Sequence, residues 1–263
     1  MLQPGRALIT GASYRLGRAM ALDLAARGWS VAIHYNASAD GAASTVVEAE
    51  ALGASAVAVQ ADLDDPKATS MLVTRAAEGL GGPLNVLINN ASTFENDTIG
   101  SITETSWDRG MGSNLKAPVM LVQDFAAQAS EPRIDEAGEP VAQAVAINLI
   151  DQRILKPTPE FMSYLLAKSA LQMFTKTAAQ ALGPKVRIAA IGPGPTIVAE
   201  NQSPGHFAMQ RRACILERGS DPDDIVCAMR FILDCKAFTG QMLAIDGGQH
   251  LTWQTPDVAG DPG

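Results

Sequence analysis

Short apolar runs alternate with longer amphipathic stretches along most of the chain. Seven runs rich in Val, Ile and Ala lack regular polar alternation, which is typical of strands covered by helices on both faces. They lie near residues 6–10, 30–34, 56–60, 85–89, 143–149, 186–192 and 241–246. This alternation of strands and helices predicts a parallel sheet built from βα units.

The stretches between the runs contain several predicted helices. Residues 15–27 have a helical apolar rhythm that ends at Gly28, and Asp65-Pro66 is a cap with a first-turn proline that predicts a helix toward Leu80. The other expected segments are two long helices at about 103–128 and 160–182, an exposed loop at 131–140, an irregular segment at 195–220 and a flexible tail at 255–263. No repeat or linker marks a second domain, so we expect one domain over residues 1–254.

Composition narrows the possible classes of protein. Of 263 residues, 47% are hydrophobic and 18% are charged, which supports a globular core and argues against a disordered chain. The formal charge of -8 disfavours sequence-independent binding to nucleic acid.

Cysteine usage and the apolar runs bear on metal binding and location. The three cysteines form no Cys-x-x-Cys pair and have no His at a ligand spacing, which predicts reduced thiols and no metal site. No signal-peptide pattern follows Met1, and no run reaches the about 20 apolar residues of a membrane helix. We therefore expect a cytoplasmic enzyme or binding protein.

A turn containing glycines follows the first predicted strand and leads into a helix. Gly11 permits the tight turn, Gly17 allows close helix packing, and the first N–H groups of the helix would point at a pyrophosphate. Two glycines after a strand are more often only a turn, but the strand-turn-helix context favours dinucleotide binding. Arg15 replaces the usual middle glycine and is predicted to point toward the cofactor or substrate. The other cofactor residues predicted in this turn are Ser13, Tyr14 and Leu16.

The end of the second strand predicts which dinucleotide is bound. An acidic residue there would accept a hydrogen bond from a ribose 2'-hydroxyl and repel a 2'-phosphate, but the sequence reads His34, Tyr35, Asn36, Ala37, Ser38. With no acid present, Arg15 close by, and Tyr35, Asn36 and Ser38 available as donors, we infer NADP(H) rather than NAD. His34, Tyr35, Asn36 and Ser38 are thus predicted cofactor residues. The alternative is that His34 and Tyr35 only complete the strand.

Polar residues after the third and fourth strands border the same crevice, because ligands of an open parallel sheet bind beyond the carboxyl ends of its strands. Asp62, followed by Leu63, is either an acceptor for the adenine amino group or a turn carboxylate. Asn90, with Ala91 and Ser92, either lines the cofactor or ties up loop backbone.

Tyr164 and Lys168 are four residues apart in a predicted helix and share one face. A nearby ammonium favours the phenolate, so Lys168 is expected to lower the pKa of Tyr164 from about 10 and give a proton donor for carbonyl or imine reduction. Such pairs are common on ordinary helix surfaces. The position of this pair, after the fifth strand of a dinucleotide-binding pattern, favours catalysis.

Taken together, the motifs resemble the short-chain dehydrogenase/reductase family over nearly the full length. The matching segments are Thr10-Gly11 with Gly17, Asp62-Leu63, Asn89-Asn90-Ala91, Asn114 in Asn-Leu-Lys-Ala-Pro, Tyr164 with Lys168, Pro193-Gly194 and Asp246-Gly247-Gly248. The resemblance implies a Rossmann-type doubly wound α/β fold with a seven-stranded parallel sheet in a single domain. It also implies a homotetramer that uses the region around residues 243–253.

The same resemblance implies the roles of individual residues. Tyr164 is the acid, Lys168 holds the nicotinamide ribose, and Asn114 supports a proton-relay water. Pro193, Gly194 and Thr196 are expected beside the cofactor.

One position departs from the family pattern. The family usually has Ser 13 residues before its Tyr, but this chain has Asp151 there. A carboxylate suits a nitrogen heterocycle, because it can orient N–H groups or relay a proton to a ring nitrogen. The alternative is a tolerated substitution in a ketone reductase or in an inactive protein.

Asp151 is typical of the pteridine reductase and dihydromonapterin reductase branch, which Arg15, residues 34–38 and Phe94 also resemble. In that branch the Phe stacks the pterin against the nicotinamide, and an Arg and a Ser line the site. The predicted substrate residues are therefore Arg15, Ser92, Phe94, Asp151, Tyr164 and Gly194. The alternative for Phe94 is a loop residue that plugs the edge of the core.

The segment at 195–220 corresponds to the family's substrate lid, or is a surface helix with its loops. Arg211 and Arg212 in it either meet an acidic substrate tail or lie on a solvated face. The sequence thus predicts NADPH-dependent reduction of a dihydropterin or related pteridine. The alternatives are a generic ketone or acyl-thioester reductase and a catalytically silent dinucleotide-binding regulator.

Overall fold

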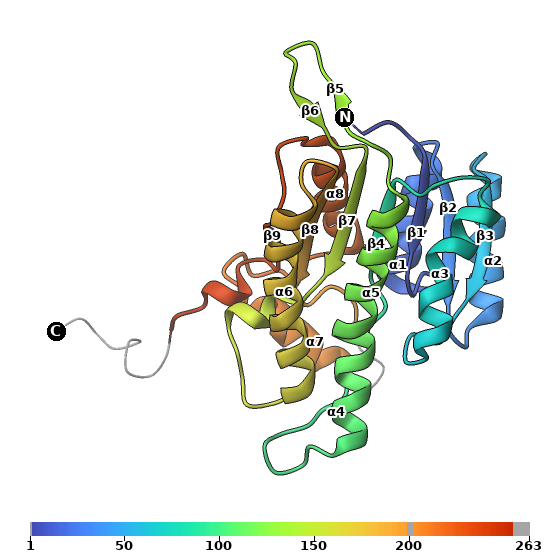
Figure 1. The fold of residues 1–263 in the computed structure, drawn as a ribbon. Helices are drawn as coiled ribbons and strands as arrows, with labels where there is room; N and C mark the ends of the chain where they lie inside the picture. Colours follow the sequence, from blue (N-terminus) through green and yellow to red (C-terminus); the bar gives the residue numbers. More distant parts are fainter. Residues whose placement is uncertain (1, 199–201, 255–263) are drawn as a thin grey trace.

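A seven-stranded parallel sheet forms the centre of the molecule (Figure 1), and its strand order is β3-β2-β1-β4-β7-β8-β9. The computed structural model describes residues 2–198 and 202–254, so the predicted tail at 255–263 lies outside the described residues. The strands are β1 (Arg6–Ile9), β2 (Ser30–Tyr35), β3 (Ala56–Gln60), β4 (Val86–Asn89), β7 (Ala144–Leu149), β8 (Val186–Pro193) and β9 (Met242–Ile245). All seven predicted strands are confirmed, as is the doubly wound class.

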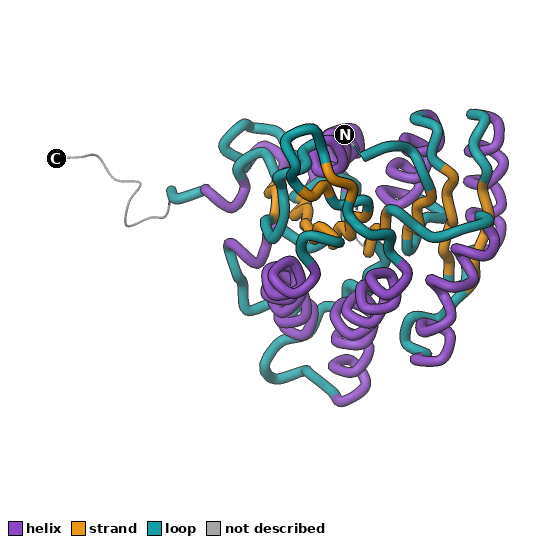
Figure 2. Tube along the Cα trace, turned by 45° about the horizontal axis from the view of Figure 1, so that its top comes forward, coloured by secondary structure: helices purple, strands orange, loops and turns teal. Residues whose placement is uncertain are grey.

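Helices cover both faces of the sheet (Figure 2). One face carries α1 (Arg15–Ala26), α2 (Ala39–Ala51) and α8 (Pro222–Asp234), and the other carries α3 (Pro66–Gly79), α5 (Ala117–Gln128) and α6 (Met162–Leu182). Successive strand side chains point to opposite faces, so Ile9 packs under the first layer and Leu8 under the second. Because both faces are buried, the strands appear in the sequence as continuous apolar runs.

The strand order reverses between β1 and β4. β1 pairs with β2 on one side and with β4 on the other, and the chain winds outward from this point in both directions. A crevice forms at such a reversal beyond the carboxyl ends of the strands. The turn after β1 and the loop after β4 therefore lie together at the expected binding position.

The predicted helix at 103–128 is built from three consecutive helical segments. These are α4 (Glu104–Met111), a π-helical turn η1 (Gly112–Lys116) and α5. Pro118 has no N–H to donate to the carbonyl of Asn114, which explains why the α-helical pattern is interrupted there. The interruption places Asn114 in a π-turn, a feature that often marks functional positions.

The prediction of an exposed loop at 131–140 was incomplete. A short antiparallel hairpin, β5 (Arg133–Ile134) with β6 (Pro140–Val141), lies in this stretch. One carboxylate oxygen of Asp135 accepts hydrogen bonds from the N–H groups of Ala137 and Glu139 and closes the turn. Local hydrogen bonds therefore form the hairpin, and apolar periodicity does not reveal it.

Two helices, α2 and α8, were not predicted from the sequence. The segment at 195–220 contains α7 (Pro204–Arg212), none of whose residues is buried, which agrees with the surface-helix alternative. Two short 3-10 turns complete the elements, η2 (Gln152–Leu155) and η3 (Gln249–Leu251). Within residues 2–198 and 202–254, no helix has the length and apolar character to cross a membrane.

Candidate active site

The predicted site residues gather at the carboxyl ends of the sheet strands, the end toward which β7 points in Figure 1. The β1–α1 turn contributes residues 11–17, β2 ends at Tyr35 before Asn36 and Ser38, and Asp62 with Leu63 follows β3. Residues 90–94 follow β4, Asp151 follows β7, and Pro193 with Gly194 and Thr196 lies at the end of β8. Segments far apart in the sequence therefore form one edge.

The turn after β1 is held against the loop after β4. Gly11 has a φ of 62°, and a Cβ at this position would lie 3.0 Å from Cα of Ala91. A Cβ on Gly17 would lie 2.4 Å from the Gly11 carbonyl oxygen. Asn90 donates from Nδ2 to the carbonyls of Thr10 at 2.9 Å and Gly11 at 3.1 Å. Asn90 thus bonds the backbone of the turn, which agrees with the second of its two predicted roles. The turn has room only for glycine at positions 11 and 17.

The N-terminus of α1 suits an anionic ligand. Tyr14 occupies the N-cap position but makes no side-chain cap hydrogen bond, and the first turn of the helix contains no acidic residue. Uncapped first-turn N–H groups and the positive end of the helix dipole attract phosphate. This end of α1 therefore fits a dinucleotide pyrophosphate.

Arg15 adopts a backbone conformation that side chains rarely take. Its φ is 56°, in the left-handed region that a glycine at the usual middle position would occupy without strain. Its guanidinium donates to the carbonyls of Val198 at 2.9 Å and Ile197 at 3.3 Å. Arg15 therefore joins the turn after β1 to the segment after β8, and its contact with a ligand stays a prediction.

His34 supports the turn from inside the sheet edge. It is buried, its Nδ1 accepts from the N–H of Gly11 at 3.0 Å, and its Nε2 lies 3.1 Å from the carbonyl of Ala61, to which this tautomer donates. Both ring nitrogens are thus used within the protein, so His34 positions Gly11 and does not present a nitrogen to a cofactor. Burial lowers the pKa of His34 to about 4, which keeps the ring neutral.

The neutral state of His34 makes the fold sensitive to acid. In the unfolded chain a His titrates near 6.5, so between that pH and about 4 the unfolded state binds a proton that the folded state does not. Above pH 6.5 neutral His34 makes its full contribution to the free energy of unfolding. As the pH falls, this free energy decreases, by about 2 kcal/mol between pH 7 and pH 5. Urea unfolding at the two pH values should show this loss in the wild type and a smaller loss in His34→Gln. Equal losses in the two proteins would contradict the assignment.

The end of β2 is free of acidic side chains, as the sequence predicts. Ser38 precedes α2 without a side-chain cap bond, and Asn36 donates weakly to Asp62 at 3.5 Å. Oδ1 of Asp62 accepts a hydrogen bond from the N–H of Asp64 at 3.0 Å, so Asp62 acts as a turn carboxylate, the second of its two predicted roles. Its contact with adenine stays a prediction.

Asn114 fixes the loop that follows β4. Its Nδ2 donates to the carbonyls of Gly110 and Thr93, both at 3.0 Å, and its Oδ1 accepts from the Ser92 hydroxyl at 2.6 Å. The side chain is fully buried. Asn114 thus sets the position of Ser92 and Thr93, and its support of a relay water stays a prediction.

Asp151 and Tyr164 form a hydrogen-bonded pair. The Tyr164 hydroxyl donates to Oδ2 of Asp151 at 2.9 Å, and Oδ1 of Asp151 accepts from the N–H of Arg153 at 2.7 Å. Lys168, one turn further along α6, donates from Nζ to the carbonyl of Leu149 at 2.8 Å. The spacing of 13 residues thus brings the carboxylate directly to the phenol.

The predicted effect of Lys168 on Tyr164 was wrong. Burial, followed by the negative charge of Asp151, raises the pKa of Tyr164 well above its ordinary value. Burial also lowers the pKa of Lys168 to about 8 and raises that of Asp151. The sequence could not show how far these groups are withdrawn from water. Tyr164 therefore keeps its proton, and Asp151 takes one up at a higher pH than an exposed aspartate does.

Aromatic side chains form one wall beside this pair. The Phe94 ring stacks on Phe161 with 4.2 Å between centroids and an angle of 11°, and meets Tyr164 edge-on at 4.8 Å. The guanidinium of Arg153 lies 4.9 Å from the Phe161 centroid and 5.9 Å from that of Phe94. Phe94 is 48% exposed, so part of its ring is open to a ligand. Phe94 therefore lies at the predicted site, and it does not plug the core.

Sequence reasoning missed three residues of this wall, namely Phe161, Arg153 and Asp97. Phe161 has a φ of 56° just before α6, a strained conformation of the kind that accumulates at functional sites. Asp97 accepts from the N–H of Met162 through its carbonyl and from that of Ser163 through its carboxylate, which holds this conformation. Only the closeness of Arg153 to Asp151 in the sequence could have drawn attention to it.

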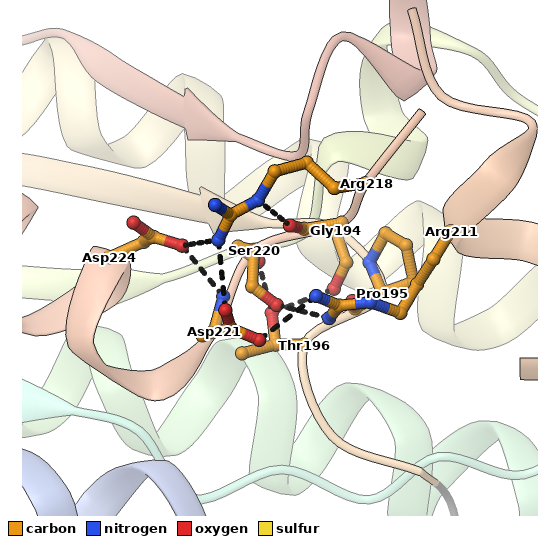
Figure 3. Close-up of polar contacts among 9 residues, drawn as sticks. Gly194, Pro195, Thr196, Arg211, Arg218, Ser220, Asp221 and Asp224 are labelled. Carbon is orange, nitrogen blue, oxygen red and sulfur yellow. Dashed lines mark hydrogen bonds and ion pairs between the residues drawn. The ribbon is translucent and has the colours of Figure 1, made fainter. Parts of the chain in front are cut away.

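The segment after β8 is closed at its base by arginines (Figure 3). Arg211 donates to the carbonyls of Pro195 at 3.1 Å and Ser220 at 2.6 Å and pairs with Asp221 at 2.9 Å. Arg218 pairs with Asp221 and Asp224. The suggestion that Arg211 meets an acidic substrate tail is therefore not supported, because its guanidinium joins the two ends of this segment.

Gly194 and Thr196 lie within the same base. A Cβ on Gly194 would lie 2.5 Å from Cβ of Asp246, so the end of β8 packs closely on the loop after β9. The Thr196 hydroxyl lies 3.0 Å from the Gly194 carbonyl and 2.5 Å from the Ser220 hydroxyl. These contacts hold the start of the segment at the carboxyl ends of the sheet strands.

Comparisons with known proteins agree with this geometry. Residues 6–204 match the family model described as short chain dehydrogenase. Pteridine reductase 1 of Leishmania tarentolae is 28% identical over 285 residues, covering 94% of this chain and 96% of that protein. The 3-oxoacyl-(acyl-carrier-protein) reductase FabG of Staphylococcus epidermidis is 29% identical, covering 93% and 98%. The crystal structure of FolM alternative dihydrofolate reductase 1 from Brucella canis complexed with NADP is 38% identical, with a TM-score of 0.88 and coverage of 99% and 100%.

Proposed function

The chain belongs to the short-chain dehydrogenase family, and from this membership we propose that it is an NADPH-dependent reductase of a dihydropteridine or a closely related nitrogen heterocycle. Reduction of a C=N bond consumes a hydride and a proton, and side chains of the protein would supply the proton. The pteridine class is also supported by the similarity to the Brucella FolM structure and to the Leishmania pteridine reductase.

The observation that carries the proposal is the bond between Tyr164 and Asp151. A ketone needs one proton donor at its oxygen, whereas a heterocycle presents both N–H donors and a ring nitrogen that must be protonated. Asp151 accepts hydrogen bonds when ionised and donates one when protonated, and burial raises its pKa. The pair thus offers both an acceptor for ring N–H groups and a source of the proton.

The residues at the carboxyl edge fit a dinucleotide. The uncapped N-terminus of α1 would hold the pyrophosphate, the end of β2 would accept a 2'-phosphate, and Lys168 would hold the nicotinamide ribose. Hydride transfer is the chemistry that the nicotinamide supplies when it is bound. Phe94 would stack the flat substrate, while Arg15, Ser92 and Gly194 would line its pocket.

A direct assay tests the proposal. NADPH oxidation is followed at 340 nm with dihydrobiopterin, dihydromonapterin, dihydrofolate and a panel of ketones. We expect turnover of at least one dihydropteridine. Turnover of ketones or acyl thioesters alone would favour a generic reductase, and tight NADPH binding without any turnover would favour the regulator.

The same assay tests the choice of cofactor. We expect kcat/KM to be roughly 10- to 100-fold higher for NADPH than for NADH, because charged hydrogen bonds to the 2'-phosphate contribute about 1.5–3 kcal/mol each. A preference for NADH would contradict the inference drawn from the end of β2. The homotetramer stays a prediction.

A further inference from the structure

Arg153 is a cation at the aromatic wall whose charge partly offsets the rise that burial causes in the pKa of nearby Asp151, but whose guanidinium forms no ion pair within 4 Å among the described residues. Its side chain donates to the Thr158 hydroxyl at 3.1 Å, and the described part of the chain forms no ion pair with it. Its backbone N–H, and not its guanidinium, binds Asp151. The guanidinium is thus placed by the rings of Phe161 and Phe94 and keeps most of its donors for another group.

The lack of an ion pair is not by itself distinctive, because within residues 2–198 and 202–254 only eight of the 20 basic residues pair with a carboxylate. The paired cations are Arg18, Arg27, Arg109, Lys185, Arg211, Arg218, Arg230 and Lys236. What distinguishes Arg153 is its place, partly buried against two rings beside Asp151 and Tyr164. This place allows its guanidinium to meet an anionic group of a molecule bound at the wall.

Two other arginines near the site are already engaged. Arg15 donates to the carbonyls of Ile197 and Val198, and Arg211 joins Pro195 to Ser220 and Asp221. Arg153 therefore offers the more available guanidinium beside Phe94. Its five donors suit a planar carboxylate or a phosphate.

We propose that Arg153 is a specificity residue that selects substrates whose heterocycle carries an anionic substituent, either carboxylate or phosphate. The inference rests on the proposed function, because a heterocycle on Phe94 would extend its substituent along the wall toward Arg153. Partial removal of the guanidinium from water by the two rings strengthens a bidentate, charge-assisted bond. A neutral substituent gains nothing comparable.

The test compares matched substrates and matched variants. Dihydroneopterin and its monophosphate differ only by the phosphate, and dihydrofolate provides carboxylates. Each is assayed with the wild type, Arg153→Gln and Arg153→Lys, and each is titrated onto the enzyme with NADP+ present. Arg133→Gln is the control, because it removes the same charge on the β5–β6 hairpin, which precedes β7 at the opposite end of the sheet.

Arg153→Gln should raise KM for the anionic substrates roughly 10- to 100-fold more than it raises KM for dihydroneopterin. Any change in kcat should be the same for neutral and anionic substrates, because the charge of Arg153 also acts on Asp151 and Tyr164. Arg153→Lys should recover part of the loss in KM. Higher salt should weaken binding of the anionic substrates to the wild type more than to Arg153→Gln. An effect on only one anionic substrate would identify phosphate or carboxylate as the group recognised.

Two results would overturn the proposal, and they are distinguishable. If Arg153→Gln raises KM equally for neutral and anionic substrates, or for neither, pteridine reduction stands but Arg153 is only part of the wall. If the wild type neither binds nor reduces any of the three compounds, the proposed function itself fails, and this inference fails with it.

Discussion

Tyr164→Phe should lower kcat for a dihydropteridine by roughly a thousandfold, within the range for losing a positioned acid. The Tyr164 hydroxyl is buried and bonded to Asp151, so the substitution removes the proton-bearing atom and keeps the ring that meets Phe94. Turnover is measured as NADPH oxidation at 340 nm, and cofactor binding is measured by fluorescence titration. NADPH affinity should stay within about twofold, because Lys168 and the α1 N-terminus are unchanged.

The control for this variant is its stability. Phe leaves one oxygen of Asp151 without its donor, while the N–H of Arg153 still binds the other oxygen. Urea unfolding should therefore show a folded protein with a modest loss of stability, of about 1–3 kcal/mol. An undiminished rate in a folded Tyr164→Phe protein would mean that the acid lies elsewhere.

Asp151→Asn should reduce pteridine turnover roughly a hundredfold at neutral pH and change its pH dependence. Asparagine can still accept from the N–H of Arg153, so the loop after β7 should keep its shape, but it cannot supply a proton. Burial raises the pKa of Asp151, so the wild type loses its protonated carboxyl, and with it part of kcat/KM, as the pH rises through that raised pKa. The variant should lack this decline.

The measurement is kcat/KM for one dihydropteridine from pH 5 to pH 9 in both proteins. Asp151→Ser, which restores the residue usual in the family, is the companion variant and should favour ketones over pteridines. If Asp151→Asn and the wild type have the same rates and the same pH profile, the carboxyl does not take part in proton delivery.

Most of the fold could be predicted, because buried strands and amphipathic helices leave a periodic record in the sequence. All seven strands of the parallel sheet were found within a few residues. The missed helix α8 begins at Asp221-Pro222, the same cap signal that revealed α3 at Asp65-Pro66. The missed hairpin depends on the hydrogen bonds of Asp135, which no apolar period records.

The residue types of the site could also be predicted, but not their electrostatics. The spacing of Tyr164, Lys168 and Asp151 was enough to place them together. The spacing could not predict the direction in which the pKa of Tyr164 shifts, because this direction depends on burial and on which group faces the phenol. His34 was likewise predicted to contact the cofactor, but in the structure both nitrogens of its ring bond to the backbone of Gly11 and Ala61.

The doubly wound sheet, the turn after β1 and the spacing of Asp151, Tyr164 and Lys168 could be predicted, because each depends on residues close in the chain or on periods of burial. The wall of the site could not be predicted, because it depends on contacts between distant segments. Phe94 lies in the loop after β4, whereas Arg153 and Phe161 both lie in the connection between β7 and α6. Their contacts exist only once β4, β7 and α6 are packed. The same packing removes Tyr164 and Asp151 from water, and this desolvation raises the pKa of both groups.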